Sequence, residues 1–511
     1  MRHRFDWSRL LGSALLVLAT ACASLPSDYP PPPHTVALAP DPTTVLGRHV
    51  ADFARRHGSD VSGYVPIDAN GEALEWRLAL VDSAERSLDL LYYLWYDDLG
   101  GLLLLEHVIE AADRGVRVRV VVDDTLFLKG KSSLAALSAH PKIEIRVFNP
   151  WASKGAARAA ETVSRAKTLN RRMHNKLMIA DTQMAILGGR NIGDHYFGLH
   201  HKYNFHDLDM IVIGDAAAES SEIFDHFWNS DRVIPATAFV KEYSWDTIEE
   251  QRGEELPQLR DTDELSGFPI TRRDWNDDLA ALVEKASPGT STLEYDKLIP
   301  GSKQVSEEAA LGLAEMTAAA KHEVLILNAY IIPGERAMEI FRTLGERGVR
   351  VRVLTNSLAS NDVPAVTAKY KKYRKPLIEA GVELYEFSAH PEIQAGIVDT
   401  DPVEARFAGL HTKALVVDHK YVYIGSLNLD PRSIRLNTEM GMIVTSPGLA
   451  AQVAAIAERD MSPTNSWRVR FDANGDLVWE SAEGTASRQP AQSGWQRFQA
   501  WFFKILPESQ L

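Results

Sequence analysis

The 511-residue sequence has almost no cysteine: Cys22 is the only one. A single cysteine cannot form a disulfide within the chain, so a small fold held together by disulfides is excluded. The N-terminal apolar run, Leu10–Leu18, is also short, because a membrane-spanning helix needs about 20 such residues. This run therefore favours a secretion signal over a transmembrane anchor.

The sequence has fewer basic residues than acidic ones. Lys and Arg together number 55 against 69 Asp and Glu, which gives a formal net charge of −14. Proteins that bind nucleic acid generally carry a basic surface that meets the phosphates. We therefore expect no nucleic acid partner, although a local basic pocket is compatible with this charge. The hydrophobic content of 45% and the charged content of 24% are typical of a globular chain.

The first 22 residues resemble a bacterial lipoprotein signal. Three arginines, the short apolar run and the small residues Ala-Thr-Ala precede Cys22. In such signals the cysteine is acylated, so the sequence predicts lipidation of Cys22 and export to the bacterial cell envelope. The residue that follows is Ala23 rather than Asp, which favours the outer membrane. The alternative is an ordinary cleaved signal with an incidental cysteine.

The sequence repeats itself over a long period. Arg114–Val120 reads Arg-Gly-Val-Arg-Val-Arg-Val, and Arg347–Val353 is identical. Each copy alternates apolar and charged residues, which predicts a strand, and each follows a helix-like stretch and an earlier apolar strand. A period this long indicates a duplicated domain rather than a solenoid. The expected strand and helix pairs are 87–96 with 101–113, and 323–332 with 335–346.

The strand–helix–strand order predicts an α/β fold. We expect two duplicated halves, each a mixed sheet flanked by helices. The segment between them is acidic and polar, which predicts a helical or irregular connector. A proline-rich spacer precedes the first half. The expected divisions are the signal at 1–22, the spacer and lead-in at 23–61, the first half at 62–234, the connector at 235–299, the second half at 300–479 and a C-terminal tail at 480–511.

Both halves contain the pattern His-x-Lys-x-x-x-x-Asp. The copies are His174, Lys176 and Asp181, and His411, Lys413 and Asp418. The surrounding residues are apolar, which predicts buried strands. Side chains alternate along a strand, so the histidine and lysine of each copy share a face while the aspartate takes the opposite parity. We therefore expect the His and Lys pairs to act chemically and the aspartates to hold turns or backbone groups.

More polar residues recur after each motif. Asn191 and Asn428 both lie 17 positions beyond the motif histidine. A carboxylate then precedes the next apolar strand in each half, Asp207 in the first and Glu439 in the second. Two such motifs with matching partners are very hard to obtain by chance, so they predict one shared site.

These groups suit the chemistry of a phosphodiester. A neutral imidazole can attack phosphorus and form a phosphohistidine, while a second, protonated one donates a proton to the departing alcohol. Lysines and asparagines stabilise the charge on the nonbridging oxygens, and a carboxylate fixes the tautomer of each histidine. No cofactor and no metal is needed. One acidic and histidine-rich group matches no specific ligand spacing, and we expect surface histidines there rather than a metal site: Asp194, His195, His200, His201 and His206.

The paired motifs resemble those of the phospholipase D superfamily, over about residues 62–479. Gly188–Asp194 and Tyr373–Glu386 further resemble bacterial cardiolipin synthases of the class C type. The resemblance implies phospholipase D-like α/β sandwich halves packed about a pseudo-twofold axis, and transfer through a phosphohistidine. It implies that His174 and His411 are nucleophile and general acid/base, with His174 favoured as the nucleophile. It also implies phosphate binding by the lysines and asparagines, and histidine-orienting roles for Asp207 and Glu439.

The expected substrates are phospholipids, with the bacterial membrane as partner. The class C resemblance implies phosphatidylglycerol as acceptor and phosphatidylethanolamine as donor, giving cardiolipin. Hydrolysis to phosphatidate is the closest alternative, a phospholipase D-like nuclease is a more distant one, and a tethering lipoprotein without activity is the last.

Two surface features bear on membrane contact. The tail places Trp495, Phe498, Phe502 and Ile505 at helical spacing, which predicts an amphipathic helix that either lies at a membrane or packs on the protein itself. A basic cluster would either meet anionic headgroups or form a solvated helix face. Its members are Lys369, Lys371, Lys372, Arg374 and Lys375.

Overall fold

The computed structural model describes residues 25–127, 131–152, 161, 169–299, 301–302 and 304–503. The signal segment 1–22, the predicted lipidation site Cys22 and the tail residue Ile505 lie outside these residues. Across the described residues, no helix is both long enough and apolar enough to cross a membrane.

The first half of the molecule alternates helices and strands in the predicted order. Its elements are α2 (Val45–His57), β1 (Ser62–Ile67), α3 (Asn70–Ser83), β2 (Ser87–Trp95), α4 (Leu99–Asp113), β3 (Arg117–Phe127), α5 (Lys131–Leu137), β4 (Ile143–Phe148), β5 (Lys176–Ala180), β6 (Met184–Gly188), α8 (Asp194–Phe197), β7 (Tyr203–His206), β8 (Asp209–Ile213), α9 (Asp215–Trp228) and β9 (Val233–Pro235). Short helical segments follow, η1 (Ala236–Phe239), α10 (Trp245–Arg260), η2 (Asp263–Leu265) and α11 (Asn276–Lys285).

The second half repeats this arrangement. Its elements are β10 (Ser287–Tyr295), α12 (Glu308–Ala318), β11 (Glu323–Asn328), α13 (Gly334–Glu346), β12 (Arg350–Asn356), α14 (Pro364–Tyr370), η3 (Lys371–Tyr373), α15 (Arg374–Glu379), β13 (Val382–Phe387), η4 (Gln394–Val398), β14 (Phe407–Leu410), β15 (Lys413–Val417), β16 (Tyr421–Gly425), α16 (Pro431–Arg435), β17 (Met440–Thr445), α17 (Pro447–Asp460), β18 (Ser466–Phe471), β19 (Leu477–Ser481), β20 (Gly484–Ala486) and α18 (Gly494–Phe502). The units predicted from the repeat are confirmed as β2, α4 and β3, and as β11, α13 and β12.

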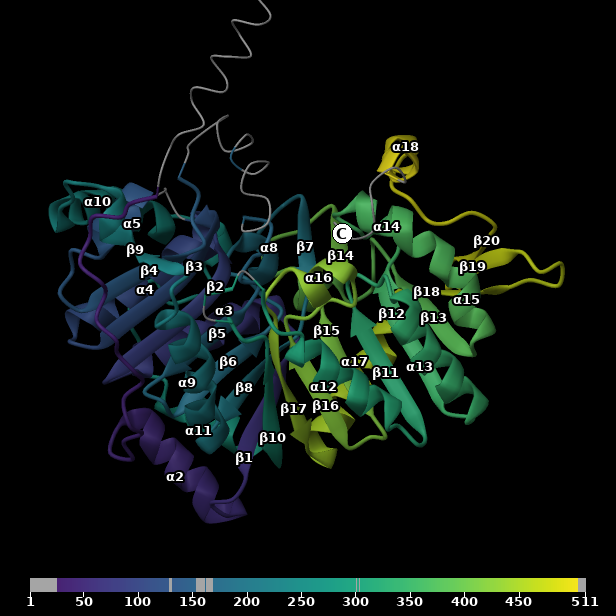
Figure 1. The fold of residues 1–511 in the computed structure, drawn as a ribbon, viewed down its shortest axis with the longest axis horizontal. Helices are drawn as coiled ribbons and strands as arrows, with labels where there is room; N and C mark the ends of the chain where they lie inside the picture. Colours follow the sequence, from purple (N-terminus) through teal and green to yellow (C-terminus); the bar gives the residue numbers. More distant parts are fainter. Residues whose placement is uncertain are drawn as a thin grey trace, which may run out of the picture.

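The two halves share one continuous mixed sheet (Figure 1). Strands β1 and β10 pair antiparallel at its middle, with Gly63 opposite Pro288. Outward from this pair, the first half continues as β8, β6, β5, β2, β3, β4 and β9, and the second as β17, β16, β15, β11, β12, β13 and β18. Equivalent strands occupy equivalent places, so the axis that relates the halves passes between β1 and β10.

Strand β10 corrects one expectation. The sequence predicted a helical or irregular connector for 235–299, and the helices α10 and α11 agree with this as far as Lys285. Ser287–Tyr295 is instead a central strand that pairs with both β1 and β17. Its Pro, Gly and Ser residues are typical of turns, but partners on both sides hold the backbone extended, so tertiary pairing overrides local propensity.

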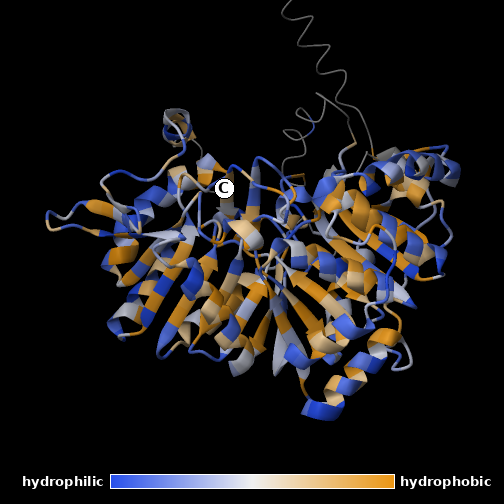
Figure 2. Cartoon of the chain, turned by 180° about the vertical axis from the view of Figure 1, so that it is seen from behind, coloured by the Kyte–Doolittle hydropathy of each residue, from blue (hydrophilic) through white to orange (hydrophobic). Residues whose placement is uncertain are grey.

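Helices cover both faces of the sheet. One apolar cluster joins α3 and α4 to the first half of the sheet, and another joins α12 and α13 to the second half. The third cluster lies under α9 and α17 and combines residues of both halves, which fixes one half against the other. The strands that flank β1 and β10 on either side carry this core and are mostly hydrophobic (Figure 2). This shared core holds the ends of β5 and β15, and with them both motifs.

Candidate active site

Each motif histidine is positioned by a short parallel contact with the opposite half. In the first half, Met173 forms a parallel bridge with Thr438, and the backbone N–H of His174 donates to the carbonyl of Thr438 at 3.0 Å. In the second half, β14 pairs parallel with β7, and the N–H of His411 donates to the carbonyl of His206 at 2.7 Å. The residue after each of these partners is a carboxylate, so each histidine comes to lie beside an acid of the other half.

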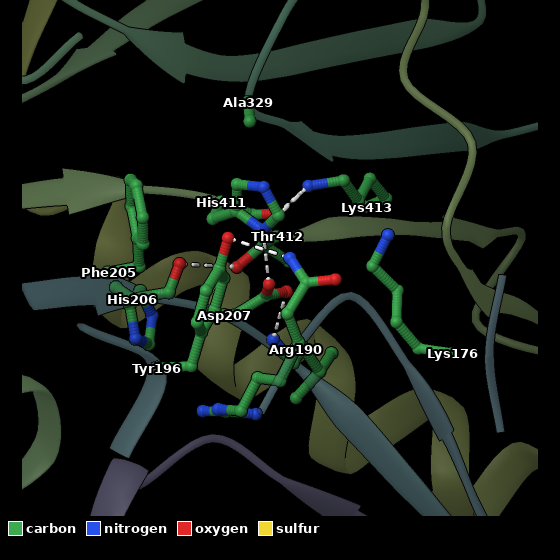
Figure 3. Close-up of polar contacts among 12 residues, drawn as sticks. Lys176, Arg190, Tyr196, Phe205, His206, Asp207, Ala329, His411, Thr412 and Lys413 are labelled. Carbon is green, nitrogen blue, oxygen red and sulfur yellow. Dashed lines mark hydrogen bonds and ion pairs between the residues drawn. The ribbon is translucent and has the colours of Figure 1, made fainter. Parts of the chain in front are cut away.

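The histidine–carboxylate pairs therefore cross between the halves. Nδ1 of His174 lies 2.9 Å from Oε2 of Glu439. Nδ1 of His411 lies 2.6 Å from Oδ2 of Asp207 (Figure 3). The sequence predicted that these two carboxylates orient the histidines but did not say which acid meets which ring. Because both pairs cross, neither half on its own contains a complete pair.

Both motif lysines fold back toward their own histidines. Nζ of Lys176 donates to the carbonyl of His174 at 2.6 Å and lies 5.2 Å from the ring centre of Tyr93. Nζ of Lys413 donates to the carbonyl of His411. Both side chains are fully buried, and the two ammonium groups point toward one region between the halves (Figure 3). They thus place two amino groups beside the two imidazoles.

The two asparagines are close to the site but are held differently. Oδ1 of Asn191 accepts from the N–H of Leu94 at 3.3 Å, and its Nδ2 donates to the hydroxyl of Tyr196 at 2.7 Å. In contrast, Oδ1 of Asn428 is buried with no hydrogen-bond partner among the described residues. The protein already satisfies Asn191, whereas the amide of Asn428 keeps hydrogen-bonding capacity for a ligand.

Aromatic rings complete the walls, and the sequence reasoning missed them. The Tyr93 ring centre lies 5.1 Å from that of His174, and the Tyr330 ring centre lies 6.3 Å from that of His411. Residues 93 and 330 are 237 positions apart, the same separation as 174 and 411. Comparing the two halves at this offset would have found them. Tyr196 and Phe205 add further contacts to His411, with ring centres 5.3 Å and 5.0 Å away.

The motif aspartates lie away from the imidazoles. Asp181 accepts hydrogen bonds from the backbone N–H groups of Glu85, Arg86 and Ser87. Asp418 does the same for three consecutive residues before and at the start of β11, namely Lys321, His322 and Glu323. Both aspartates have φ 52°, a left-handed conformation that Asp adopts more readily than most residues. Each one anchors the lead-in of a neighbouring strand.

The sequence matches the family described as "Cardiolipin synthase, PLD-like domain" twice, over residues 78–228 and 313–461. Each match contains one motif and one of the crossed carboxylates. The chain belongs to this family of phospholipase D-like enzymes.

Curated relatives agree with the family. The chain is 32% identical to cardiolipin synthase C of Escherichia coli (strain K12), over 87% of this chain and 95% of that protein. It is 23% identical to cardiolipin synthase 2 of Staphylococcus epidermidis (strain RP62A), over 78% and 68% of the two chains. A crystal structure of phosphatidylserine synthase from Haemophilus influenzae Rd KW20 superimposes with a TM-score of 0.53 at 14% identity, covering 81% of this chain and 90% of that one, and shares the fold.

Burial determines the protonation of the imidazoles in this phospholipase D-like site. Burial, with Lys176 and Lys413 nearby, lowers the pKa of His174 well below its ordinary value. Burial and Lys413 lower the pKa of His411 to about 3, although Asp207 opposes the shift. Both rings are therefore neutral near pH 7. Burial also lowers the pKa of Lys413 to about 8.

The two carboxylates respond to burial in opposite ways. Burial raises the pKa of Glu439 to about 8, only partly offset by Lys176. Burial alone would raise the pKa of Asp207 too, but Lys413 and His411 reverse this and hold it below its usual range. Asp207 is thus an anion. Because an anionic carboxylate can only accept, Nδ1–H of His411 donates to Asp207. Nδ1 therefore cannot also accept a hydrogen bond from Nζ of Lys413, which lies 2.9 Å away.

The histidine-rich group corrects another expectation, since not all of its members are surface residues. His206 is buried and pairs with Asp460 at 2.7 Å. Asp194 is also buried and accepts from the N–H of Gly100 at 2.8 Å, next to the start of α4. Strand β7 places His206 in the core beside His411. The mostly polar residues at 200–206 do not predict this burial. Among the described residues, no three or more His, Cys, Asp or Glu side chains are grouped so that they could hold a metal ion.

Proposed function

We propose that the chain is a phosphatidyltransferase that joins two phospholipids into cardiolipin through a phosphohistidine. The observation that supports this best is the crossed pairing of His174 with Glu439 and of His411 with Asp207. It brings two imidazoles, each oriented by a carboxylate, into one place lined by two lysines. That is the set of groups that a double displacement at phosphorus requires.

In the proposed first step, Nε2 of His174 attacks the phosphorus of the donor lipid. The bond between phosphorus and the headgroup oxygen breaks, and the departing oxygen takes a proton from Nε2 of His411. In the second step, the hydroxyl of the acceptor lipid returns a proton to His411 and attacks phosphorus, and the bond to His174 breaks. The anionic Asp207 favours His411 as the acid/base, because it stabilises the imidazolium that forms in each turnover.

The raised pKa of Glu439 supports the same assignment. A carboxyl that is largely protonated near neutral pH can orient the His174 ring, but it stabilises an imidazolium less strongly than the anionic Asp207 does. His174 then keeps the neutral lone pair that a nucleophile needs. His411 gains its proton once the substrate anion is bound, since a phosphate beside the ring adds the negative charge that raises its pKa.

We propose that Lys176, Lys413 and Asn428 bind the nonbridging oxygens. Both lysines are buried, so their interaction with an anion is weakly screened. The buried amide of Asn428, with its unpartnered Oδ1, is the group with capacity for a further bond. Asn191, whose amide is already bonded to Leu94 and Tyr196, instead positions Tyr196 beside His411.

A lipid substrate is supported by an apolar cavity of about 330 Å³ next to the site. Leu427 and Leu429, which flank Asn428, lie in its wall together with Leu415, two residues beyond Lys413. Helices α12, α13 and α16 form most of the rest of the wall. We propose that a fatty acyl chain lies here while its phosphate lies at Lys413. The named cardiolipin synthases among the relatives support phosphatidylglycerol as acceptor, and the similarity to cardiolipin synthase C supports phosphatidylethanolamine as donor.

Product analysis tests this function. The purified chain is incubated with phosphatidylglycerol and phosphatidylethanolamine, and the lipids and free headgroups are identified by mass spectrometry. Cardiolipin together with free ethanolamine or glycerol supports transfer. Phosphatidate as the only product would identify a hydrolase instead. Cleavage of DNA without any lipid turnover would favour the nuclease alternative.

We further propose that the mature protein is an exported lipoprotein of the bacterial cell envelope, acylated at Cys22 and anchored in the outer membrane. The signal-like residues 1–22 support this proposal. Radiolabelled palmitate should enter the protein and should no longer enter Cys22→Ser. Unchanged labelling of Cys22→Ser would contradict the anchor.

A further inference from the structure

The C-terminal helix α18 is turned with its aromatic side outward. Trp495, Phe498, Trp501 and Phe502 are 65%, 48%, 62% and 52% exposed. At about 100° per residue these four side chains occupy one stripe roughly 120° wide. Gln496 and Ala500, on the opposite side, are the residues that are buried. This is the reverse of a helix that packs its apolar face on the core. Of the two alternatives left by the sequence, packing on the protein is therefore wrong for Trp495, Phe498 and Phe502.

The helix is nevertheless well defined and firmly attached. Ser493 caps its N-terminus by accepting from the N–H of Gln496 at 3.2 Å. Nε2 of Gln492 donates to the carbonyl of Ala359 at 2.5 Å, just ahead of α14. Hydrogen bonds at its N-terminus thus join α18 to the segment that leads into α14.

The charge carried by α18 itself is positive. Within α18 the only charged residue is Arg497, which is exposed, and the helix contains no acid. Next to α18 lies α14, and the basic cluster of the sequence follows on α14, η3 and α15, with Lys372 and Lys375 exposed. Arg374 is an exception, because it is buried against Glu386 and helps to hold α15 in place. In a chain with a net charge of −14, this local excess of positive residues stands out.

The surface also lies on the side of the molecule that carries β7 and β14. In Figure 1, α18, α14, β14 and β7 lie along the same upper edge, and β14 leads directly into His411. The loop that begins at Ala359 continues to Asp362, whose Oδ1 accepts from the hydroxyl of Tyr330 at 2.5 Å. Tyr330 in turn contacts the ring of His411. A partner bound to α18 would thus be close to the site.

We propose that the aromatic stripe of α18 is a membrane-docking surface that inserts into the interface of an anionic phospholipid bilayer. Trp and Phe side chains favour the boundary between headgroups and acyl chains, and Arg or Lys residues beside them attract anionic headgroups. An exposed aromatic stripe on a helix that carries Arg497 and no acid matches this chemistry. The proposal concerns binding and holds whichever acceptor the enzyme uses.

Vesicle binding of the full chain tests the proposal. All proteins carry Cys22→Ser, so that no acyl group dominates the binding. The variant Trp495→Ala/Phe498→Ala/Trp501→Ala/Phe502→Ala keeps good helix formers and should lower the partition onto phosphatidylglycerol-rich vesicles by about tenfold or more. The matched control Val36→Ser/Tyr243→Ser removes two other exposed apolar side chains and should leave it unchanged. Equal partition of the four-residue variant and the parent would overturn the proposal.

A second readout locates the helix directly. Trp495→Phe/Trp501→Phe removes the two indoles but keeps the apolar face, so it should bind vesicles normally. Quenching by lipids brominated on the acyl chains should be clearly stronger in the parent than in this variant. Equal quenching would contradict insertion. If analytical ultracentrifugation showed that the four-residue variant only lost self-association, with vesicle binding intact, the stripe would be a contact between copies and the proposal would be wrong. Neither readout requires turnover, so a failure of the proposed function would be seen separately.

Discussion

Glu439 of the second half holds the ring of His174 of the first half, with Nδ1 and Oε2 2.9 Å apart. Asp207 of the first half holds His411 of the second in the same way. Duplication of the unit has therefore produced one site and not two, because each half supplies the histidine of one pair and the acid of the other. The shared sheet and the shared core keep the four groups in register.

Replacing the two carboxylates should produce distinguishable defects. Glu439→Gln should slow attack by His174, and Asp207→Asn should slow proton transfer by His411, each by about 10²-fold or more. A phosphatidyl ester of p-nitrophenol needs no protonation of its leaving group, so it should restore much of the first-step rate of Asp207→Asn but not that of Glu439→Gln. Single-turnover release of p-nitrophenol measures this. The opposite pattern of rescue would show that the roles of the two histidines are reversed.

Activity should fall as the pH rises through about 8. Lys413 has its pKa lowered to about 8, so it is charged below that pH and loses its charge above it. Glu439 has its pKa raised to about 8 and becomes an anion over the same range. Both changes make the site less attractive to a phosphodiester anion. A profile of kcat/KM against pH should show this alkaline limb, and a profile that stays flat to pH 10 would contradict it.

Asp181 should matter for stability more than for catalysis. Asp181→Ala removes the acceptor of three buried or half-buried backbone N–H groups and places Ala at φ 52°, which should lower the free energy of unfolding by about 2–4 kcal/mol. Asp181→Asn keeps an acceptor and tolerates this φ, so it should cost less. Urea denaturation measures both. We expect the folded fraction of either variant to keep its turnover within a few fold, whereas a 10²-fold loss at unchanged stability would place Asp181 in the chemistry.

Gly189 should be sensitive to the smallest added side chain. A Cβ at this position would lie 2.2 Å from Oδ1 of Asp207, so Gly189→Ala must displace the acid that orients His411. A displacement of about 1 Å in such a group lowers turnover by roughly 10²-fold. Gly253→Ala, in the exposed helix α10 with nothing within 4 Å of the new Cβ, is the matched control and should keep full activity. Equal activity of the two variants would show that Asp207 is not needed in its observed place.

Much of the site was predictable from local patterns. Strand parity placed His174 with Lys176 and separated Asp181, and the structure has them in that arrangement. The repeat predicted the strand–helix–strand units for the same reason, since alternation and helical spacing are properties of a few neighbouring residues.

The crossed pairs could not be predicted in this way. The contact of His411 with Asp207 depends on the pairing of β14 with β7, which are about 200 residues apart in sequence and carry no local signal for each other. Strand β10 was not predicted because its residues are typical of turns, and only pairing with β1 and β17 holds its backbone extended. Asn191 and Asn428 look equivalent in sequence. Asn191 bonds to the hydroxyl of Tyr196, whereas Ser433, which takes the place of Tyr196 in the second half, leaves Oδ1 of Asn428 without a hydrogen bond from any described residue.

The central claim is that two motifs form one site that works through a single phosphohistidine. Intact-mass measurement of the chain, quenched at neutral or alkaline pH during turnover of a phospholipid, tests it most directly. We expect at most one phosphatidyl group per chain and no adduct in His174→Ala. In His411→Ala we expect an adduct on His174 to accumulate when the donor is the p-nitrophenol ester, whose leaving group needs no proton from His411. Two phosphatidyl groups on one chain, or near-normal turnover in either histidine variant, would contradict it.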